Sequence, residues 1–384
     1  MAAAQLFRES GFHRVGVDDV AAAVGIGGSA VYRHFASKQG LLAHVVFDGV
    51  AQIEQMLDAV GPGQPAGQLA EGVRGMARIA VTKREFAALW QLESRHLPQD
   101  ARQEFRDRLR AVVRRQARFL QAVRPDLSTN DADLLSWAAT DVYASPAHHS
   151  ITLPGGQLQA MIEAMALRVL ATQLPPSPYG SRVATVTAAL PPRTSRREVL
   201  LAAAARLFTV RGFQAVGIEE IGAAAGVSGP GVYRHFDSKQ DLLAAVLNRA
   251  AEWLGVSMSR ALASASDVRH ALDLVLESYV DFGYHHPDLL RTLVGEVGNL
   301  PPEQAEQYRR AQTDYYAEWA NLLNAVRPEL SAAEARTLVW GAVSIVNDLP
   351  GIRRFRARPS LAGDLTTVAS AVLLGASRVP AGRA

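Results

Sequence analysis

Residues 226–243 read Gly-Val-Ser-Gly-Pro-Gly-Val-Tyr-Arg-His-Phe-Asp-Ser-Lys-Gln-Asp-Leu-Leu, and residues 25–42 read Gly-Ile-Gly-Gly-Ser-Ala-Val-Tyr-Arg-His-Phe-Ala-Ser-Lys-Gln-Gly-Leu-Leu. The two stretches belong to an internal repeat, in which residues 2–45 align with 203–246 without a gap and 25 of the 44 pairs are identical. A weaker match continues along the rest of the chain. Its period of about 200 residues is far longer than that of a solenoid, so the chain is one two-part protein that has been duplicated and fused.

The composition is that of an ordinary globular protein. Of 384 residues 48% are hydrophobic and 20% charged, and a net charge of +3 neither requires nor excludes an anionic partner. The absence of cysteine excludes a disulfide framework, a thiolate nucleophile and a Cys-ligated zinc site. The sequence shows no signal-peptide layout and no apolar run of about 18 residues, so we expect a cytoplasmic protein that does not span a membrane.

The repeat and the linker between its copies predict the domain organisation. Prolines and small residues between the copies are typical of an exposed linker. The expected segments are a first head at 1–46, a first body at 47–174, the linker at 175–193, a second head at 194–248 and a second body at 249–384.

The pattern of the second head predicts three short helices. Ser195 and Glu198 have capping-box spacing before an apolar stripe, and Gly212 provides a left-handed stop. A second helix closes at Gly226, and Ser228 is placed to cap the third. Three short helices with a glycine turn between the last two are typical of a helix-turn-helix domain.

The first head departs from this pattern in two places. Gly27 replaces the capping serine, and the segment equivalent to 194–201 is missing, which leaves open whether the natural start lies upstream of Met1. Beyond the heads both copies carry long helical patterns, such as Val73–His96 and Gln99–Val123, and few strand signals. We therefore expect an all-α protein.

The third helix of each head carries side chains suited to the major groove of DNA. Small residues in its first turn allow close approach to base edges, and the tyrosine and histidine that follow offer polar tips to phosphate oxygens. The arginine between them can reach a base or a phosphate, and a lysine on the next helix places a cation beside the backbone. The predicted DNA-binding residues are Gly28, Ser29, Ala30, Tyr32, Arg33, His34 and Lys38 in copy one, and Gly229, Pro230, Gly231, Tyr233, Arg234, His235 and Lys239 in copy two.

A Tyr-Arg-His run can also be a solvated helix face, but its recurrence in the same turn context favours DNA binding. The residues nearest the bases differ between the copies, Ser29-Ala30 against Pro230-Gly231, while the phosphate-facing residues are the same. We therefore expect the two heads to enter consecutive major grooves about 34–36 Å apart and to read unlike half-sites of a non-palindromic operator.

The two quoted stretches resemble the DNA-binding signature of TetR-family transcriptional regulators. The doubled layout is similar to the tandem TetR regulators of actinobacteria, some of which control lipid-uptake operons. The resemblance implies a helical effector-binding domain after each head, with its last two helices packing against a partner as a four-helix bundle. In a fused chain that bundle can form between residues 132–174 and 331–378, which predicts an intrachain pseudo-dimer and leaves a further homodimer open.

An effector pocket in each body is expected to be mostly apolar. The candidate lining residues are Phe86, Trp90, Phe105, Trp137 and Tyr143 in copy one, and Tyr308, Tyr315, Trp319 and Trp340 in copy two. A small apolar effector, a lipid or an acyl thioester, follows from family analogy alone. For each of these aromatic residues, plain core packing is the competing interpretation.

Cofactor and metal chemistry are not predicted. Residues 25–30 formally fit a dinucleotide-binding pattern, but they follow a helix and Ser228 breaks the pattern in copy two. Adjacent histidines on a helix point apart and form no metal site. The arginines from Arg102 to Arg118 are expected to form a solvated helix face.

The sequence thus predicts a ligand-responsive repressor that binds double-stranded operator DNA. An enzyme would need a nucleophile–base pair or a cofactor loop, and the sequence supports neither. A helical scaffold that binds other proteins is the second alternative, and it leaves the repeated Tyr-Arg-His and lysine unexplained.

Overall fold

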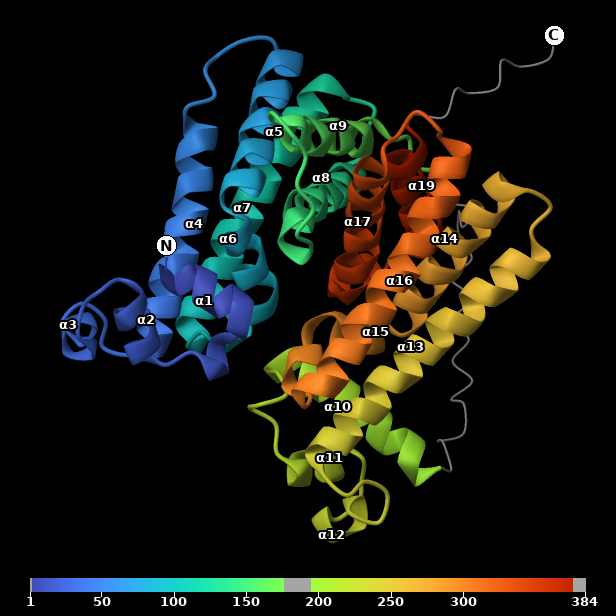
Figure 1. Ribbon diagram of the computed structural model, residues 1–384. Coiled ribbons are helices and arrows are strands. Elements are labelled where there is room, and N and C mark those ends of the chain that lie inside the picture. Colours follow the sequence, from blue (N-terminus) through green and yellow to red (C-terminus); the bar gives the residue numbers. More distant parts are fainter. Residues whose placement is uncertain (1, 176–194, 376–384) are drawn as a thin grey trace. The chain divides into compact units, whose positions relative to one another are not determined.

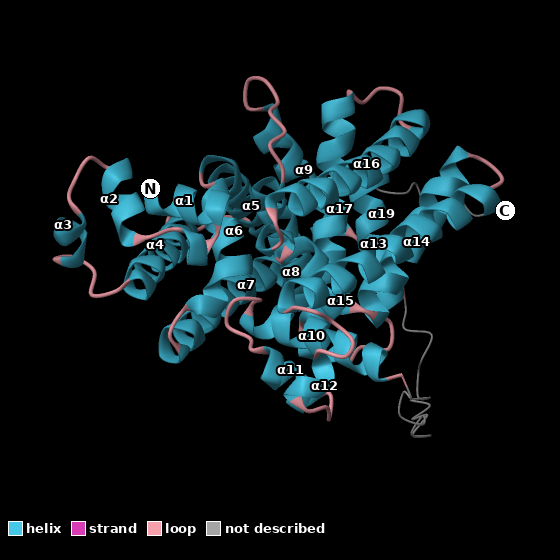
Figure 2. Cartoon of the chain, turned by 60° about the horizontal axis from the view of Figure 1, so that its bottom comes forward, coloured by secondary structure: helices cyan, strands magenta, loops and turns pink. Residues whose placement is uncertain are grey.

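The computed structural model describes residues 2–175 and 195–375. Within these residues all regular structure is helical and no strand occurs (Figure 2), which confirms the expected all-α fold. No helix in this part of the chain is both long and apolar enough to cross a membrane. The linker expected at 175–193, apart from its first residue, and the final residues 376–384 lie outside the described residues.

The described chain forms two compact units. The first holds the chain up to Leu174, together with Arg327–Ile345 and the residues from Thr367 onward. The second holds the chain from there to Val326, together with Val346–Thr366. The units therefore do not coincide with the two copies, because parts of the last helices of copy two belong to the first unit.

The first unit has a three-helix head, a body, and the two segments from copy two. In its body α4, α5 and α7 pack against one another, and α9 packs on α5 and α8 (Figure 1). Its own helices are α1 (Ala2–Ser10), α2 (Val17–Ala23), α3 (Gly28–Tyr32), α4 (Lys38–Asp58), α5 (Pro65–Thr82), α6 (Arg84–Ala88), α7 (Gln99–Val123), α8 (Thr129–Ala144) and α9 (Gln157–Ala171). Short 3₁₀ and π turns follow at Phe12–Arg14, Leu89–Glu93, Ser94–His96 and Ser145–His148.

The second unit repeats the head and much of the body. Its helices are α10 (Arg196–Arg211), α11 (Ile218–Ala224), α12 (Gly229–Val232), α13 (Lys239–Ser264), α14 (Val268–His285), α15 (Pro287–Gly295), α16 (Pro302–Val326) and α18 (Arg353–Arg356). Helices α17 (Ala332–Asp348) and α19 (Leu361–Leu374) each have one part in each unit.

The sequence predicts only some of the interactions that begin and end the head helices. The stop at Gly212 is confirmed, since this glycine adopts a φ of 81° that disfavours other residues. Ser195 and Ser228 stand at the predicted N-cap positions, but in the described chain neither side chain makes a capping bond, so that part of the prediction is wrong. Glu198, the other member of the expected capping box, instead pairs with Arg249.

Serine caps form instead at the start of the long helices, at Ser37 and Ser238, and an acidic cap forms on the second helix of each head. The carboxylate of Asp19 accepts the N–H of Gly16 at 2.7 Å, and that of Glu220 accepts the N–H of Gly217 at 2.8 Å. Each carboxylate satisfies an N-terminal donor and lies favourably at the positive end of the helix. The recurrence of this acidic cap in both copies indicates that the repeat preserves the start of this helix.

The long helix expected over Val73–His96 is interrupted. Helix α5 ends at Thr82, and Lys83 turns the chain with φ −132° and ψ 47°. In copy two the equivalent break falls at His286, where the following Pro287 disfavours helical geometry in the residue before it. Copy one has the same helix break but no proline after it, so its sequence does not indicate where the helix ends.

The first unit joins helices from both copies. Gln157 at the start of α9 donates to Glu334 of α17 at 2.7 Å. The ring of Trp340, also on α17, stacks on that of His148 with 6.3 Å between centroids. Gly341 lies close to α9, because a Cβ placed there would be 2.7 Å from the sulfur of Met165.

Candidate DNA-binding interface and effector pockets

The third helix of each head leaves its predicted contact residues exposed. Val31 and Val232 anchor α3 and α12, with exposed fractions of 5% and 0%. The tyrosines that follow them are 56% exposed at Tyr32 and 54% at Tyr233. The arginine and histidine after each tyrosine are exposed as well. This surface of each head is therefore open to phosphates and base edges, and the DNA contacts themselves stay a prediction.

Lys239 has a structural role that sequence reasoning missed. Its Nζ donates to the carbonyl oxygens of Phe213 and Val216, both at 3.0 Å, and lies 4.3 Å from the centroid of the Phe213 ring. Burial lowers the pKa of this lysine. A compact ammonium with three donors suits this position better than a planar guanidinium, which accounts for a lysine in a chain rich in arginine.

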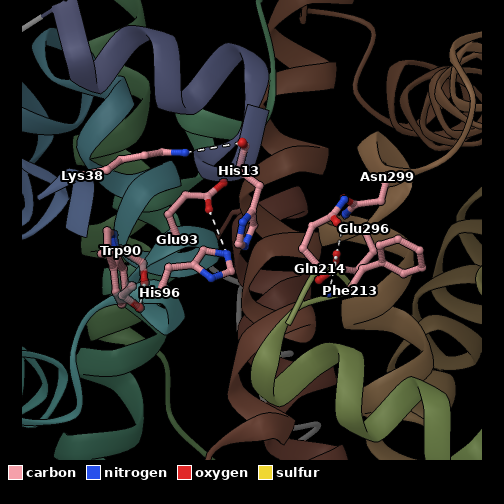
Figure 3. Close-up of polar contacts among 10 residues, drawn as sticks. His13, Lys38, Trp90, Glu93, His96, Phe213, Gln214, Glu296 and Asn299 are labelled. Atoms are coloured by element: carbon pink, nitrogen blue, oxygen red, sulfur yellow. Dashed lines mark hydrogen bonds and ion pairs between the residues drawn. The ribbon is translucent and has the colours of Figure 1, made fainter. Parts of the chain in front are cut away.

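Lys38 occupies the equivalent place in the first head with looser contacts. Its Nζ lies 3.4 Å from the carbonyl oxygen of His13 and 4.4 Å from the centroid of the Phe12 ring (Figure 3). Burial again lowers its pKa. Both lysines thus tie the start of the long helix to the turn after the first head helix. The phosphate contact expected of them remains a prediction.

The second head packs its helix-turn-helix more tightly than the first. A Cβ at Gly222 on α11 would lie 2.7 Å from the carbonyl oxygen of Val227 and 3.0 Å from Cγ2 of Val232. Glycine therefore allows the close approach of α11 to α12. The first head has Ala21 at this position.

The first head leaves more of its apolar side chains exposed. Val24 is 50% exposed, whereas Ala225 at the equivalent position is 6% exposed. Phe236 is buried, with the guanidinium of Arg197 5.0 Å from its ring centroid. Phe35, at the equivalent position of the first head, is only half-buried.

A histidine pair lies where the first head meets its body. The rings of His13 and His96 are edge to face with centroids 4.4 Å apart, and Nε2 of His96 lies 3.4 Å from a carboxylate oxygen of Glu93 (Figure 3). Burial is the largest cause that lowers the pKa of His96 to about 3, followed by the charge of Arg95. His96 is therefore held neutral near neutral pH.

Copy two places an amide pair at the equivalent positions. Gln214 donates to Asn299 at 2.9 Å, and Asn299 donates to Glu296 at 2.7 Å (Figure 3). The buried Glu296 also accepts the backbone N–H of Phe213 at 3.3 Å. The repeat thus keeps the acidic residue and exchanges a titratable pair for a neutral one.

We expect the free energy of unfolding of the first unit to fall as the pH drops below about 6.5. The unfolded chain takes up a proton at His96 near pH 6.5, whereas the folded chain resists it down to about pH 3. The stabilisation is fully present above the unfolded pKa and is lost progressively below it. Replacing the pair by the residues of copy two, His13→Gln with His96→Asn, should reduce the loss between pH 7 and 4 by about 1–3 kcal/mol. Denaturant titrations at both pH values measure it, and equal losses in the two proteins would contradict the expectation.

Three of the five aromatic residues predicted for copy one surround one cavity. Phe86, Trp90 and Tyr143 line a space of about 30 Å³ whose walls are otherwise almost entirely apolar. Lys83 and Thr140 are the polar residues among them. This volume holds about one water molecule, so an effector would have to enlarge it.

The other two aromatic residues of copy one do not line this cavity. Phe105 is buried on α7 and meets the ring of Phe47 edge to face at 6.4 Å. Trp137 is 8% exposed on α8. Both positions fit the competing interpretation of core packing.

The four aromatic residues predicted for copy two lie in three separate surroundings. Trp319 is fully buried against Tyr279 and Tyr315, with ring centroids 5.6 and 6.4 Å away. The hydroxyl of Tyr308 donates to the carbonyl of residue 244 at 3.2 Å. Trp340 belongs to the first unit, as described above. Tyr279, at the centre of the cluster, was not predicted, since a tyrosine on an apolar helix face is indistinguishable from ordinary core in the sequence.

Comparison with known proteins gives consistent matches. The family model "Bacterial regulatory proteins, tetR family" matches residues 1–45 and 200–246. The transcriptional activator FasR of Mycolicibacterium smegmatis is 35% identical over 157 residues, which cover 41% of this chain and 71% of FasR. The transcriptional repressor KstR2 of Rhodococcus jostii is 30% identical over 163 residues, which cover 39% of this chain and 79% of KstR2. A solved TetR-family regulator from Bordetella parapertussis is 18% identical with a TM-score of 0.44, over 48% of this chain and 96% of that one.

Two helix-turn-helix heads with exposed third helices, in a chain whose described residues form only helices, define a DNA-binding transcriptional regulator. The sequence identity to FasR and KstR2 shows which family of regulators this is. The chain belongs to the TetR family of bacterial regulatory proteins, which confirms the resemblance seen in its heads, and its tandem arrangement is confirmed by the two matched segments.

Proposed function

We propose that this protein is a ligand-responsive repressor whose two unlike heads bind one non-palindromic operator as an intrachain pseudo-dimer. The observation that carries the proposal is the pair of exposed recognition surfaces, which share Tyr-Arg-His and differ at Ser29-Ala30 and Pro230-Gly231. The residues expected to contact phosphates are the same in both heads, so both heads bind the DNA backbone in the same way. The residues expected to contact bases differ, so the two heads recognise different base sequences.

Contacts inside the first unit support the intrachain pairing. Helices α8 and α9 of copy one are equivalent to α17 and α19 of copy two, and segments of all four belong to this unit. Arg168 of α9 donates to the carbonyl of Val372 on α19 at 3.5 Å, and Gln157 donates to Glu334. In an ordinary two-chain regulator these contacts would join two subunits.

The cavity of copy one supports an apolar effector. Binding must enlarge the 30 Å³ space, and Phe86, one of its walls, also lines a neighbouring cavity together with Ala4 of the head. A Cβ at Gly49 on α4 would collide with the Phe86 ring, so displacement of the ring acts directly on the long helix that follows the head. A ligand that binds better to the enlarged state would shift the protein toward it and change the fit of the heads to DNA. An acyl chain is the effector class that family analogy favours.

The proposal is repression rather than activation, and among the relatives FasR is an activator and KstR2 a repressor. A reporter gene behind the operator decides between them. Its expression should rise when this gene is deleted, and a fall would make the protein an activator.

Selection of binding sites from random DNA tests the proposal as a whole. We expect a single enriched sequence with two unlike half-sites, bound with an affinity that falls steeply with salt because several phosphates are neutralised. A perfect palindrome would contradict unlike heads. Failure to enrich any sequence would favour a protein-binding scaffold, and turnover of a small molecule would favour an enzyme.

A further inference from the structure

Each unit has a cavity where its head meets its body. The cavity has a volume of about 310 Å³ in the second unit and about 80 Å³ in the first. The two correspond by the repeat: Ala4 on the first head helix matches Ala205, and Lys83 matches His286 at the other side. These last two residues end their helices with nearly the same backbone angles, φ −132°, ψ 47° and φ −130°, ψ 50°.

The cavity is present in both copies, but the residues that line it differ in charge and polarity. In the first unit the wall on the long helix includes Asp48 and Gln52, which bond to each other at 2.7 Å. In the second unit Arg249 and Trp253 stand at these positions. The indole of Trp253 is half-buried and stacks on the fully buried Phe282, with 4.4 Å between centroids and 19° between planes. The larger cavity is therefore lined by a stacked pair of aromatic rings that the smaller one lacks.

Two arginines line the same cavity. Arg249 donates to both carboxylate oxygens of Glu198, at 2.7 and 2.8 Å. This pair joins the first helix of the head, α10, to the long helix α13, and its side chains are 39% and 27% exposed. A partly exposed pair of this kind contributes little net stability, so another carboxylate can exchange with Glu198. Arg356 adds a second, exposed guanidinium from α18.

We propose that this cavity binds a small aromatic carboxylate. Its ring lies against Trp253, and its carboxylate is held by Arg356 and Arg249 in place of Glu198. The volume lies within the range of small-molecule sites, and guanidinium forks match a carboxylate in geometry as well as charge. Exchange at Arg249 removes the ion pair between α10 and α13 and thereby alters how the second head is held. This regulatory part rests on the proposed function, whereas the binding site does not.

Titration calorimetry of the full chain tests the site with indole-3-acetate as the probe. We expect saturable binding of one probe per chain. Arg356→Ala should weaken it about 10- to 100-fold, because a charge-assisted contact is lost. Trp253→Gln, which installs the residue of copy one, should weaken it at least about 10-fold, because the stacking surface is lost. Arg353→Ala is the matched control, since Arg353 is exposed on the same helix but does not line the cavity.

The proposed binding site would be wrong if the unaltered chain showed no saturable binding at millimolar probe, or if Arg356→Ala or Trp253→Gln bound the probe as tightly as the unaltered chain. It would also be wrong if tryptamine, which has the same ring and the opposite charge, bound equally tightly. A second measurement compares operator affinity with and without the probe. We expect a change of at least threefold in the unaltered chain and none in Trp253→Gln. Binding of the probe without this change would overturn the regulatory part. A chain that binds no DNA at all would contradict the proposed function, while the calorimetry would still decide the site.

Discussion

A chain carrying Arg33→Ala and Arg234→Ala together should bind its selected operator about 10²- to 10⁴-fold more weakly than the unaltered chain, because each arginine contact with a base contributes about 1–3 kcal/mol. Both arginines are exposed and stand directly after the exposed tyrosine of a recognition helix. Fluorescence anisotropy with labelled duplex at one fixed salt concentration measures the loss. The free energy of unfolding should not change, since neither side chain packs in the core.

Arg118→Ala is the control for this experiment. Arg118 is an exposed arginine on α7, within the predicted solvated face. Its removal changes the net charge by one unit without touching a head, so operator affinity should change less than about threefold at physiological salt. If the double head variant binds as tightly as this control, the recognition surfaces are not those assigned. Lysine substitutions would be less informative, because Lys239 also holds the turn at Phe213.

Replacing Gly341 by leucine should destabilise the first unit where helices of the two copies meet. A Cβ at this position on α17 would lie 2.7 Å from the sulfur of Met165 and 3.3 Å from Cγ1 of Val372, and both of those side chains are fully buried. Overpacking of this kind costs about 1–3 kcal/mol of the free energy of unfolding. Because the crowded side chains belong to α9 and α19, the pairing of helices from the two copies should be what weakens.

Gly255→Leu provides the matched comparison. Gly255 also lies in a long helix, α13, but a Cβ there meets nothing within 4 Å. Leucine has a higher helix propensity than glycine, so this variant should be as stable as the unaltered chain or slightly more so. Denaturant unfolding of both variants makes the comparison. Equal stability of Gly341→Leu and Gly255→Leu would show that α17 does not pack against α9.

The heads could be predicted from the sequence because their determinants are local. Turn glycines, buried valines and an exposed Tyr-Arg-His run lie within one short segment, and the repeat displays the segment twice. The roles of Lys38 and Lys239 were missed because they depend on carbonyl groups that lie far away in the sequence. The sequence showed that these two positions favour lysine, but it could not show which group the lysine contacts.

The pockets were harder to predict, for a physical reason. Phe86 and Phe105 are both aromatic residues on helices, yet Phe86 lines the cavity described above and Phe105 does not. What distinguishes them is the break at Lys83, which sequence periodicity did not reveal. The cavities between heads and bodies were missed altogether, because their walls come from helices far apart in the sequence, from Ala4 to Phe86 in the first unit and from Glu198 to Arg356 in the second. Only the aligned exchange of Asp48 for Arg249 and of Gln52 for Trp253 could have indicated a change of chemistry there.

The central claim is that one chain supplies both heads to one duplex. Native mass spectrometry of the full chain with the duplex obtained by selection tests this most directly, because it counts chains per duplex. We predict one chain per duplex, and a duplex in which either half-site is scrambled should bind far more weakly. A complex that contains two chains on the intact duplex and still forms when one half-site is scrambled would contradict the account.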